Sequence, residues 1–245
     1  MYQLKQLKNF TELVHGASTR EEGNMSFRWG KEGDVLKNRE KFLNRLGISL
    51  DNCVNLSLQH GTEVVRVSNG DKGKGMYGQD GVFGDTLITK EKGLFLFLVT
   101  ADCLPVIFYD RKNGIVALCH AGWKGADKKI VQKVAEVFIK DYGSEPANIY
   151  VGIGPAIHSE SYKFLDPVQK KLPSWAEFIE NLPDGQTTVD LVGYAVRQLT
   201  DAKVLEENIM VSEIDTVVSP NFFSHRRSVK TGEPEGRFAT IVGIR

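Results

Sequence analysis

Apolar residues fall into short runs along most of the chain, and each run has about the length of a β-strand. The run LFLFLVT at residues 94–100 is almost continuously apolar, which is typical of a strand that is covered on both faces. Pro105 precedes the next run, and an Asn113-Gly114 turn leads into the one after it. Strands are expected at residues 54–59, 64–67, 94–100, 106–109, 115–118, 149–153, 210–218 and 238–244.

Three other segments show apolar residues at helical spacing. The clearest helix is expected over residues 127–142, where the spacing runs from Ile130 to Phe138 and Gly143 supplies the stop. Two more helices are expected over residues 34–46 and 190–202, each opened by an aspartate that can cap it.

Strands and helices alternate irregularly, and several strands are joined by short turns in place of helical crossovers. This order predicts an α+β fold of mixed sheets with helices outside, and argues against a regular doubly wound fold. The chain has no internal repeat and no linker rich in Pro, Gly or Ser. Residues 1–245 are therefore expected to form a single catalytic domain.

Charge and cysteine content narrow the classes of function. The 31 basic and 31 acidic residues cancel, so there is no global field to recruit nucleic acid or an anionic membrane. No apolar run is long enough to cross a bilayer, and the first residues lack an apolar signal segment. The three cysteines are too few for a disulfide framework and fit a reducing compartment. We expect a cytoplasmic protein that binds neither nucleic acid nor membrane.

Three residues with metal-binding or nucleophilic side chains, His60, Cys103 and His120, each fall at the end of a predicted strand. One Cys and two His form a donor set for catalytic zinc, which leaves a fourth position for water or substrate. The same residues allow a metal-free hydrolase, with Cys103 as nucleophile, His120 as its base and Asp102 nearby. They also allow a buried cysteine and a hydrogen-bonded core histidine without any chemistry. The pattern leaves these three interpretations open.

Local features add possible anion sites to a chain with no net charge. The helix expected after His120 would direct its N-terminal dipole toward the same region and favour an anion there. Arg20 lies in a polar loop that could lend its guanidinium to an anionic ligand, whereas Arg39 lies on the helix predicted over residues 34–46, where a solvated face is the default. Strand alternation turns Cys119 away from the face that His120 uses, so Cys119 is expected in the core.

Six segments of the chain resemble those of the laccase-domain family, also described as multicopper polyphenol oxidase-type purine nucleoside phosphorylases. In chain order they are HGASTR, LQHG, TADCLPVIFYD, ALCHAGWKG, VGIGPAI and FFSHRR. The likeness covers nearly the whole chain, and TADC with HAGWKG is its most specific pair. The resemblance implies a layered α/β/β/α sandwich and a zinc ion held by His60, Cys103 and His120.

The resemblance also implies a set of activities. Family members cleave purine nucleosides such as adenosine and inosine with phosphate to give the free base and ribose 1-phosphate. Deamination of adenosine and phosphorolysis of methylthioadenosine are implied as well, and an older assignment is copper-dependent oxidation of phenols. A multicopper oxidase needs more than the five histidines present here, although one Cys and two His could hold a single copper. The expected partners are a purine nucleoside and phosphate, bound by a monomer or homodimer.

These activities require further groups beside the metal. Deamination by a zinc-bound hydroxide needs a neighbouring acid or base, for which Asp102 is the candidate. Phosphorolysis needs donors for the phosphate dianion, and arginine can grip phosphate through two hydrogen bonds. The candidate phosphate ligands are Arg20, Arg39, Arg226 and Arg227.

The chain departs from the family pattern near its C-terminus. Asp215-Thr216 stands where the family often has Cys-Thr, and extra residues between Thr231 and Arg237 interrupt the closing TGR segment. The predicted metal ligands are unaffected, so the departures concern only what the C-terminal loop does.

Overall fold

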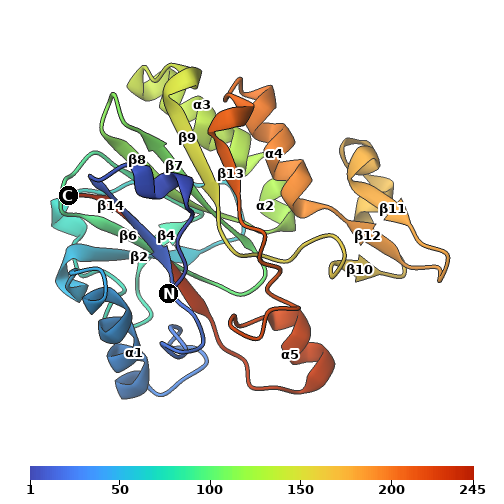
Figure 1. The fold of residues 1–245 in the computed structure, drawn as a ribbon, viewed down its shortest axis with the longest axis horizontal. Helices are drawn as coiled ribbons and strands as arrows, with labels where there is room; N and C mark the ends of the chain where they lie inside the picture. The colour runs from blue at the N-terminus through green and yellow to red at the C-terminus, as the bar shows by residue number, and fades with distance from the viewer.

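A computed structural model describes residues 1–245 and shows two large mixed sheets with helices on their outer faces (Figure 1). In spatial order, the five-stranded sheet contains β1 (Leu13–Ala17), β14 (Phe238–Ile244), β6 (Phe95–Thr100), β2 (Cys53–Leu58) and β4 (Val82–Gly84). The six-stranded sheet contains β13 (Ile209–Val211), β9 (Ile149–Ile153), β7 (Leu104–Asp110), β8 (Ile115–Ala121), β5 (Thr86–Thr89) and β3 (Val64–Arg66). Both sheets combine parallel and antiparallel pairs, as the irregular order of elements predicts.

Five helices and a small third sheet complete the fold. The helices are α1 (Glu32–Asn44), α2 (Trp123–Asp127), α3 (Ile130–Tyr142), α4 (Leu191–Asp201) and α5 (His225–Thr231). The third sheet contains β10 (Lys163–Phe164), β12 (Thr187–Val189) and β11 (Ile179–Asn181), and it lies to one side of the large sheets (Figure 1). None of the helices has the length and apolar character needed to cross a membrane.

Strand alternation divides the core into layers. On β7, Val106 and Phe108 pack toward α3 and α4, while Ile107 and Tyr109 join the cluster between the two sheets. On the far side of the five-stranded sheet, Phe42 of α1 packs with residues of β6. The order helix, sheet, sheet, helix confirms the predicted α/β/β/α sandwich. The apolar run at residues 94–100 is buried because β6 is covered from both sides.

Several boundaries differ from the sequence-based prediction. The helix expected over residues 127–142 begins three residues later, as α3 (Ile130–Tyr142), because Lys129 adopts a left-handed backbone (φ 60°). The short helix α2 before it was not predicted. Gly143 ends α3 in the same conformation, as predicted (φ 67°). The strand expected over residues 210–218 is only the short β13. Strand β8 extends to Ala121, so it carries His120 within the sheet.

Candidate active site

A pocket of about 470 Å³ opens near the ends of β6 and β8. Its lining includes the three predicted zinc ligands, His60, Cys103 and His120, together with Asp102 and Arg226. The volume lies within the range of pockets that bind small organic molecules, roughly 300–1,000 Å³. The structure thus gathers most of the predicted site from four separate parts of the chain.

Cys103 follows a strained turn between β6 and β7. The preceding residue, Asp102, has φ 82°, which is unusual for a residue with a side chain. Its carboxylate accepts hydrogen bonds from the Thr216 hydroxyl (2.7 Å) and the Arg226 backbone N–H (2.6 Å), and its carbonyl accepts one from the Ile157 N–H (2.9 Å). These contacts hold the unfavourable backbone in place. Asp102 therefore positions Cys103, with both carboxylate oxygens already engaged.

His120 and Cys103 approach each other across Gly122. A Cβ atom at residue 122 would lie 3.1 Å from Cys103 Sγ and 3.4 Å from His120 Cε1, so a side chain there would crowd both. The His120 backbone N–H donates to the Asp85 carbonyl (2.8 Å), which fixes this end of β8. The His60 ring stands edge-on to the His120 ring, with 5.2 Å between centroids.

Burial keeps the Cys103–His120 pair neutral near pH 7. It raises the pKa of the Cys103 thiol to about 12, with the adjacent Asp102 charge adding to the shift. It lowers the pKa of the His120 imidazole to about 4, and the neighbouring His60 contributes in the same direction. A nucleophilic cysteine needs a lowered pKa and an exposed thiolate. The environment of Cys103 therefore gives no support to a metal-free hydrolase.

His60, Cys103 and His120 are suited to zinc by residue type, but their side chains are not close enough together in the structure to surround a metal ion. No three or more His, Cys, Asp or Glu side chains are arranged to hold a metal ion. Two imidazoles and a thiol are ordinary zinc donors, and the space left by Gly122 brings the thiol and the His120 ring together. His60 is exposed and has φ 59° just after β2, whereas His120 is fixed within β8. The three residues therefore fit zinc by donor type. To complete the site, the loop that carries the exposed His60 would have to move toward Cys103 and His120.

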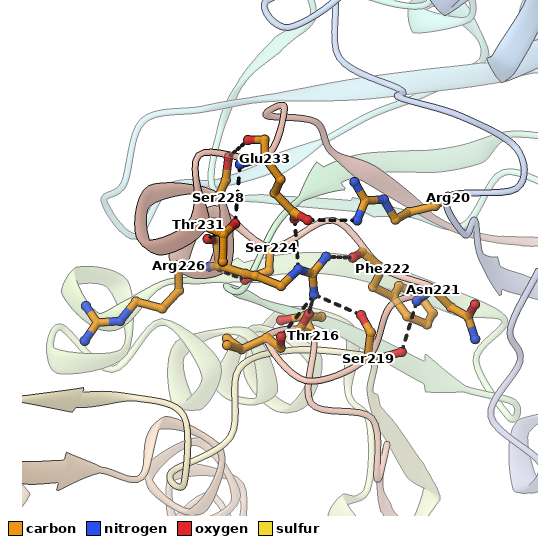
Figure 2. A network of polar contacts seen from close by, with 12 residues as sticks. Arg20, Thr216, Ser219, Asn221, Phe222, Ser224, Arg226, Ser228, Thr231 and Glu233 are labelled. Carbon is orange, nitrogen blue, oxygen red and sulfur yellow. Dashed lines mark hydrogen bonds and ion pairs between the residues drawn. The ribbon is translucent and has the colours of Figure 1, made fainter.

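Arg226 is the only predicted phosphate ligand that lines this pocket. Its guanidinium lies 4.4 Å from the centre of the Phe164 ring and donates from Nη2 to the Lys163 carbonyl. Figure 2 shows the side chain of Arg226 turned away from the drawn hydrogen-bond network, which includes the bonds of the next residue, Arg227. Arg226 can therefore contact a ligand in the pocket, whereas Arg227 cannot.

Arg227 and Arg20 lie in a structural network outside the pocket (Figure 2). The Glu233 carboxylate pairs with Arg227 Nε at 2.8 Å and with Arg20 Nη1 at 3.2 Å. The other donors of Arg227 bind backbone carbonyls of the irregular segment before α5. These carbonyls belong to Thr216, Val217, Ser219 and Phe222.

Arg39 also lies away from the Cys103 pocket, and the expectation of a solvated face is wrong. Its side chain is 1% exposed and crosses from α1 to the loop after β3. Nε donates to the Met25 carbonyl (2.9 Å), and Nη1 donates to the carbonyls of Gly75 (2.7 Å) and Met76 (3.0 Å). Burial lowers the pKa of Arg39 to about 10. Arg39 thus lines no part of the Cys103 pocket, and three of its hydrogen bonds go to backbone carbonyls.

The departures from the family pattern supply contacts around the site. Both Glu233 and Glu235 come from the extra residues that interrupt the closing TGR segment. Glu233 pairs with Arg227, while Glu235 pairs with His225 at the pocket. Thr216, the residue of the family's Cys-Thr pair that this chain keeps, donates a hydrogen bond to Asp102. The C-terminal loop therefore supports the turn and the helix that border the pocket.

His225 also lines the pocket, although no role was predicted for it. Its Nδ1 lies 2.6 Å from the Glu235 carboxylate, which leaves the other ring nitrogen free. Aromatic side chains complete the wall at Trp123, Tyr162 and Phe164. The FFSHRR segment contained the signal for His225, but its glutamate partner lies in a loop ten residues further on. That pairing was not predictable from residue spacing.

Comparison with known proteins gives consistent matches over most of the chain. A family model described as "Multi-copper polyphenol oxidoreductase laccase" matches residues 9–245. "Purine nucleoside phosphorylase YlmD" of Bacillus subtilis is 34% identical over 228 residues, covering 88% of this chain and 79% of that protein. The crystal structure of YlmD from Geobacillus stearothermophilus has a TM-score of 0.89 at 32% identity, covering 96% of this chain and 93% of that one. A hypothetical protein YfiH from Bacillus licheniformis has the same TM-score at 29% identity, covering 97% and 95% of the two chains.

Proposed function

The chain belongs to the multi-copper polyphenol oxidoreductase laccase family, and from this premise we propose that it is a zinc-dependent purine nucleoside phosphorylase acting in the Cys103 pocket. The observation that carries the proposal is one pocket that combines a thiol and three imidazoles with a guanidinium and aromatic walls. Two relatives, both called purine nucleoside phosphorylase YlmD, support phosphorolysis as the proposed reaction.

His60, Cys103 and His120 would hold the metal. Bound zinc supplies a Lewis acid that polarises an oxygen atom and lowers the pKa of a coordinated water to about 7. The same donors would accept a single copper, because imidazole and thiolate bind both metals and availability decides between them. Metal analysis of protein purified from cells grown with equal zinc and copper distinguishes the two.

The remaining pocket residues have roles in phosphorolysis. Arg226 would donate hydrogen bonds to phosphate, whose oxygen attacks C1′ of the ribose while the bond to N9 of the purine breaks. The electron pair of that bond passes to the base, and a proton added to the purine neutralises it. His225, oriented by Glu235, would deliver this proton. Trp123 and Phe164 would contact the flat faces of the purine.

We extend the proposal to adenosine deamination and to phosphorolysis of methylthioadenosine, which would use the same purine site. Deamination requires a group that transfers protons beside C6 of the adenine. Asp102 remains the predicted group, although its carboxylate already accepts two hydrogen bonds. His225 is the alternative, and the adenosine-to-inosine rates of Asp102→Asn and His225→Ala variants distinguish them.

The expected cellular setting follows from the thiols. Cys53, Cys103 and Cys119 are all free, which fits a reducing cytoplasm. Purine nucleoside and phosphate would be the only partners required for turnover. The reaction needs no second subunit in this proposal, so monomer and homodimer are both compatible with it.

Substitution of Cys103 tests the metal and the site together. Cys103→Ser should lose zinc and phosphorolysis in parallel while remaining folded by circular dichroism. Cys53→Ala is the matched control, because Cys53 is a free cysteine buried against α1, away from the pocket. Stoichiometric zinc retained by a folded Cys103→Ser variant would contradict the proposed ligand set.

A further inference from the structure

A second pocket, of about 340 Å³, lies between α1 and the β2–β4 edge of the five-stranded sheet. It shares no lining residue with the Cys103 pocket. Strand β2 connects the two pockets, because Ser57 lines the second and His60, just after the strand, lines the first. The second pocket is therefore a separate site that the proposed reaction does not use.

The second pocket is bordered by a buried positive charge that has no carboxylate partner. Three backbone carbonyls occupy Nε and Nη1 of Arg39, and no protein acceptor binds Nη2. The rings of Phe27 and Phe97 lie 4.4 Å and 5.0 Å from the guanidinium carbon and fix the orientation of the group. A buried charge is normally paired, since neutral carbonyls compensate it only in part. The free edge of Arg39 therefore favours an anionic oxygen from outside the chain.

An unpartnered amide lines the same pocket. Asn55, on β2, is 6% exposed, and its Oδ1 has no hydrogen-bond partner. Turning the amide over would only exchange the unpaired oxygen for an amino group, so a buried polar group would still lack a partner. Buried side-chain polar atoms are usually satisfied, and exceptions call for an explanation. A ligand with a hydrogen-bonding group beside its anionic oxygen would satisfy both Asn55 and Arg39.

The rest of the lining determines the character of that ligand. Phe27 and Phe83 contribute aromatic surface, and Phe83 is 62% exposed, which is unusual for so large an apolar side chain. Arg28 and Asp80 both line the pocket and carry opposite charges. The charge that remains uncompensated in the pocket is therefore that of Arg39.

We propose that this pocket binds a small organic oxyanion, a carboxylate or a phosphate monoester, that carries a flat apolar group. An anionic oxygen accepts hydrogen bonds from Nη2 of Arg39, and a hydrogen-bonding group of the ligand pairs with the Asn55 amide. The flat group contacts Phe27 and Phe83. This assignment stands independently of the reaction proposed for the Cys103 pocket.

The experiment uses two probes that share a phenyl group and differ in the oxyanion, benzoate and phenyl phosphate. Each is titrated against the whole protein while the melting temperature is followed. At least one probe should raise the melting temperature of the wild type, and that probe identifies the preferred oxyanion. The rise should be unchanged in Cys103→Ser, because the Cys103 pocket is not involved.

Two variants locate the binding. Asn55→Asp keeps the shape of the side chain but places a negative charge in the pocket, so it should abolish the rise in melting temperature. Phe83→Ala changes an exposed residue and should leave the fold intact while weakening the probe several-fold. Val218→Ala, at another exposed apolar residue (73%), is the matched control and should bind normally.

Three results would overturn the proposal. One is the absence of stabilisation by either probe. Another is stabilisation that disappears in Cys103→Ser, which would place the probe in the first pocket. The last is unchanged binding in a folded Asn55→Asp variant together with unchanged binding in Phe83→Ala. None of these results bears on phosphorolysis, so the two proposals fail separately.

Discussion

Two adjacent arginines should have different roles: Arg227 stabilises the fold, whereas Arg226 binds the ligand. Arg227 donates to four backbone carbonyls at 2.6–3.1 Å and pairs with Glu233, and its side chain is only 15% exposed. The carbonyls belong to a segment without regular secondary structure, so the guanidinium replaces the backbone partners that a sheet or helix would provide. We predict that Arg227→Ala mainly destabilises the fold.

The size of the effect follows from these contacts. Hydrogen bonds to a charged group contribute about 1.5–3 kcal/mol each when removed singly, but they are not additive. Removing one partner of a buried charged network costs about 3–5 kcal/mol, and we take this as the expected loss. For a chain of this length, each kcal/mol lowers the melting temperature by roughly 2–4 °C, so a decrease of roughly 10 °C is expected.

Arg226→Ala is the matched control, because it removes a neighbouring arginine of the same helix. Its side chain makes one hydrogen bond, to Lys163, and one contact with the Phe164 ring, so about 1.5–3 kcal/mol should be lost, less than for Arg227→Ala. Thermal and urea unfolding of both variants provide the comparison. An Arg227→Ala protein that melts like the wild type but has lost activity would refute the structural role.

Three further predictions concern the pocket and the core. Arg226→Ala should raise the KM for phosphate, by roughly 10-fold or more if one charged hydrogen bond of about 1.5–3 kcal/mol is lost, with a smaller effect on the KM for nucleoside. Gly122→Ala places a methyl group 3.1 Å from Cys103 Sγ and should weaken zinc binding, measured by competition with a chelator, by roughly 10–100-fold without unfolding the protein. Burial lowers the pKa of His15 from 6.5 to about 4, so only the unfolded chain is protonated between these values. The contribution of neutral His15 to the free energy of unfolding is thus fully present above pH 6.5 and falls by about 1.4 kcal/mol per pH unit toward pH 4. His15→Gln should reduce this pH dependence, measured by urea unfolding at pH 7 and pH 5.

The core of the site could be predicted because it depends on strand ends. His60, Cys103 and His120 follow or end apolar runs, and the sheets bring those ends to one pocket. Alternation along β8 also placed Cys119 in the core with α3, as expected. Local periodicity placed each residue at a strand end. The meeting of His60 with His120 depends on the packing of the two sheets, because β2 and β8 belong to different sheets.

The role of Arg39 could not be assigned from the sequence because its partners are remote backbone atoms. Arg39 binds the carbonyls of Gly75 and Met76, which lie 36 and 37 residues further along the chain. An arginine on a helix that looks amphipathic gives no sign that its head group will enter a distant loop. The later start of α3 was missed because the left-handed backbone at Lys129 leaves the apolar spacing from Ile130 to Phe138 unchanged.

The most direct test of the central claim is product analysis of the zinc-loaded protein with inosine, with and without phosphate. Chromatography should show hypoxanthine and ribose 1-phosphate in equal amounts, and only when phosphate is present. Unchanged inosine under both conditions, with zinc still bound, would contradict the phosphorylase assignment. Hypoxanthine released equally without phosphate, together with free ribose, would also contradict it, because the reaction would then be hydrolysis.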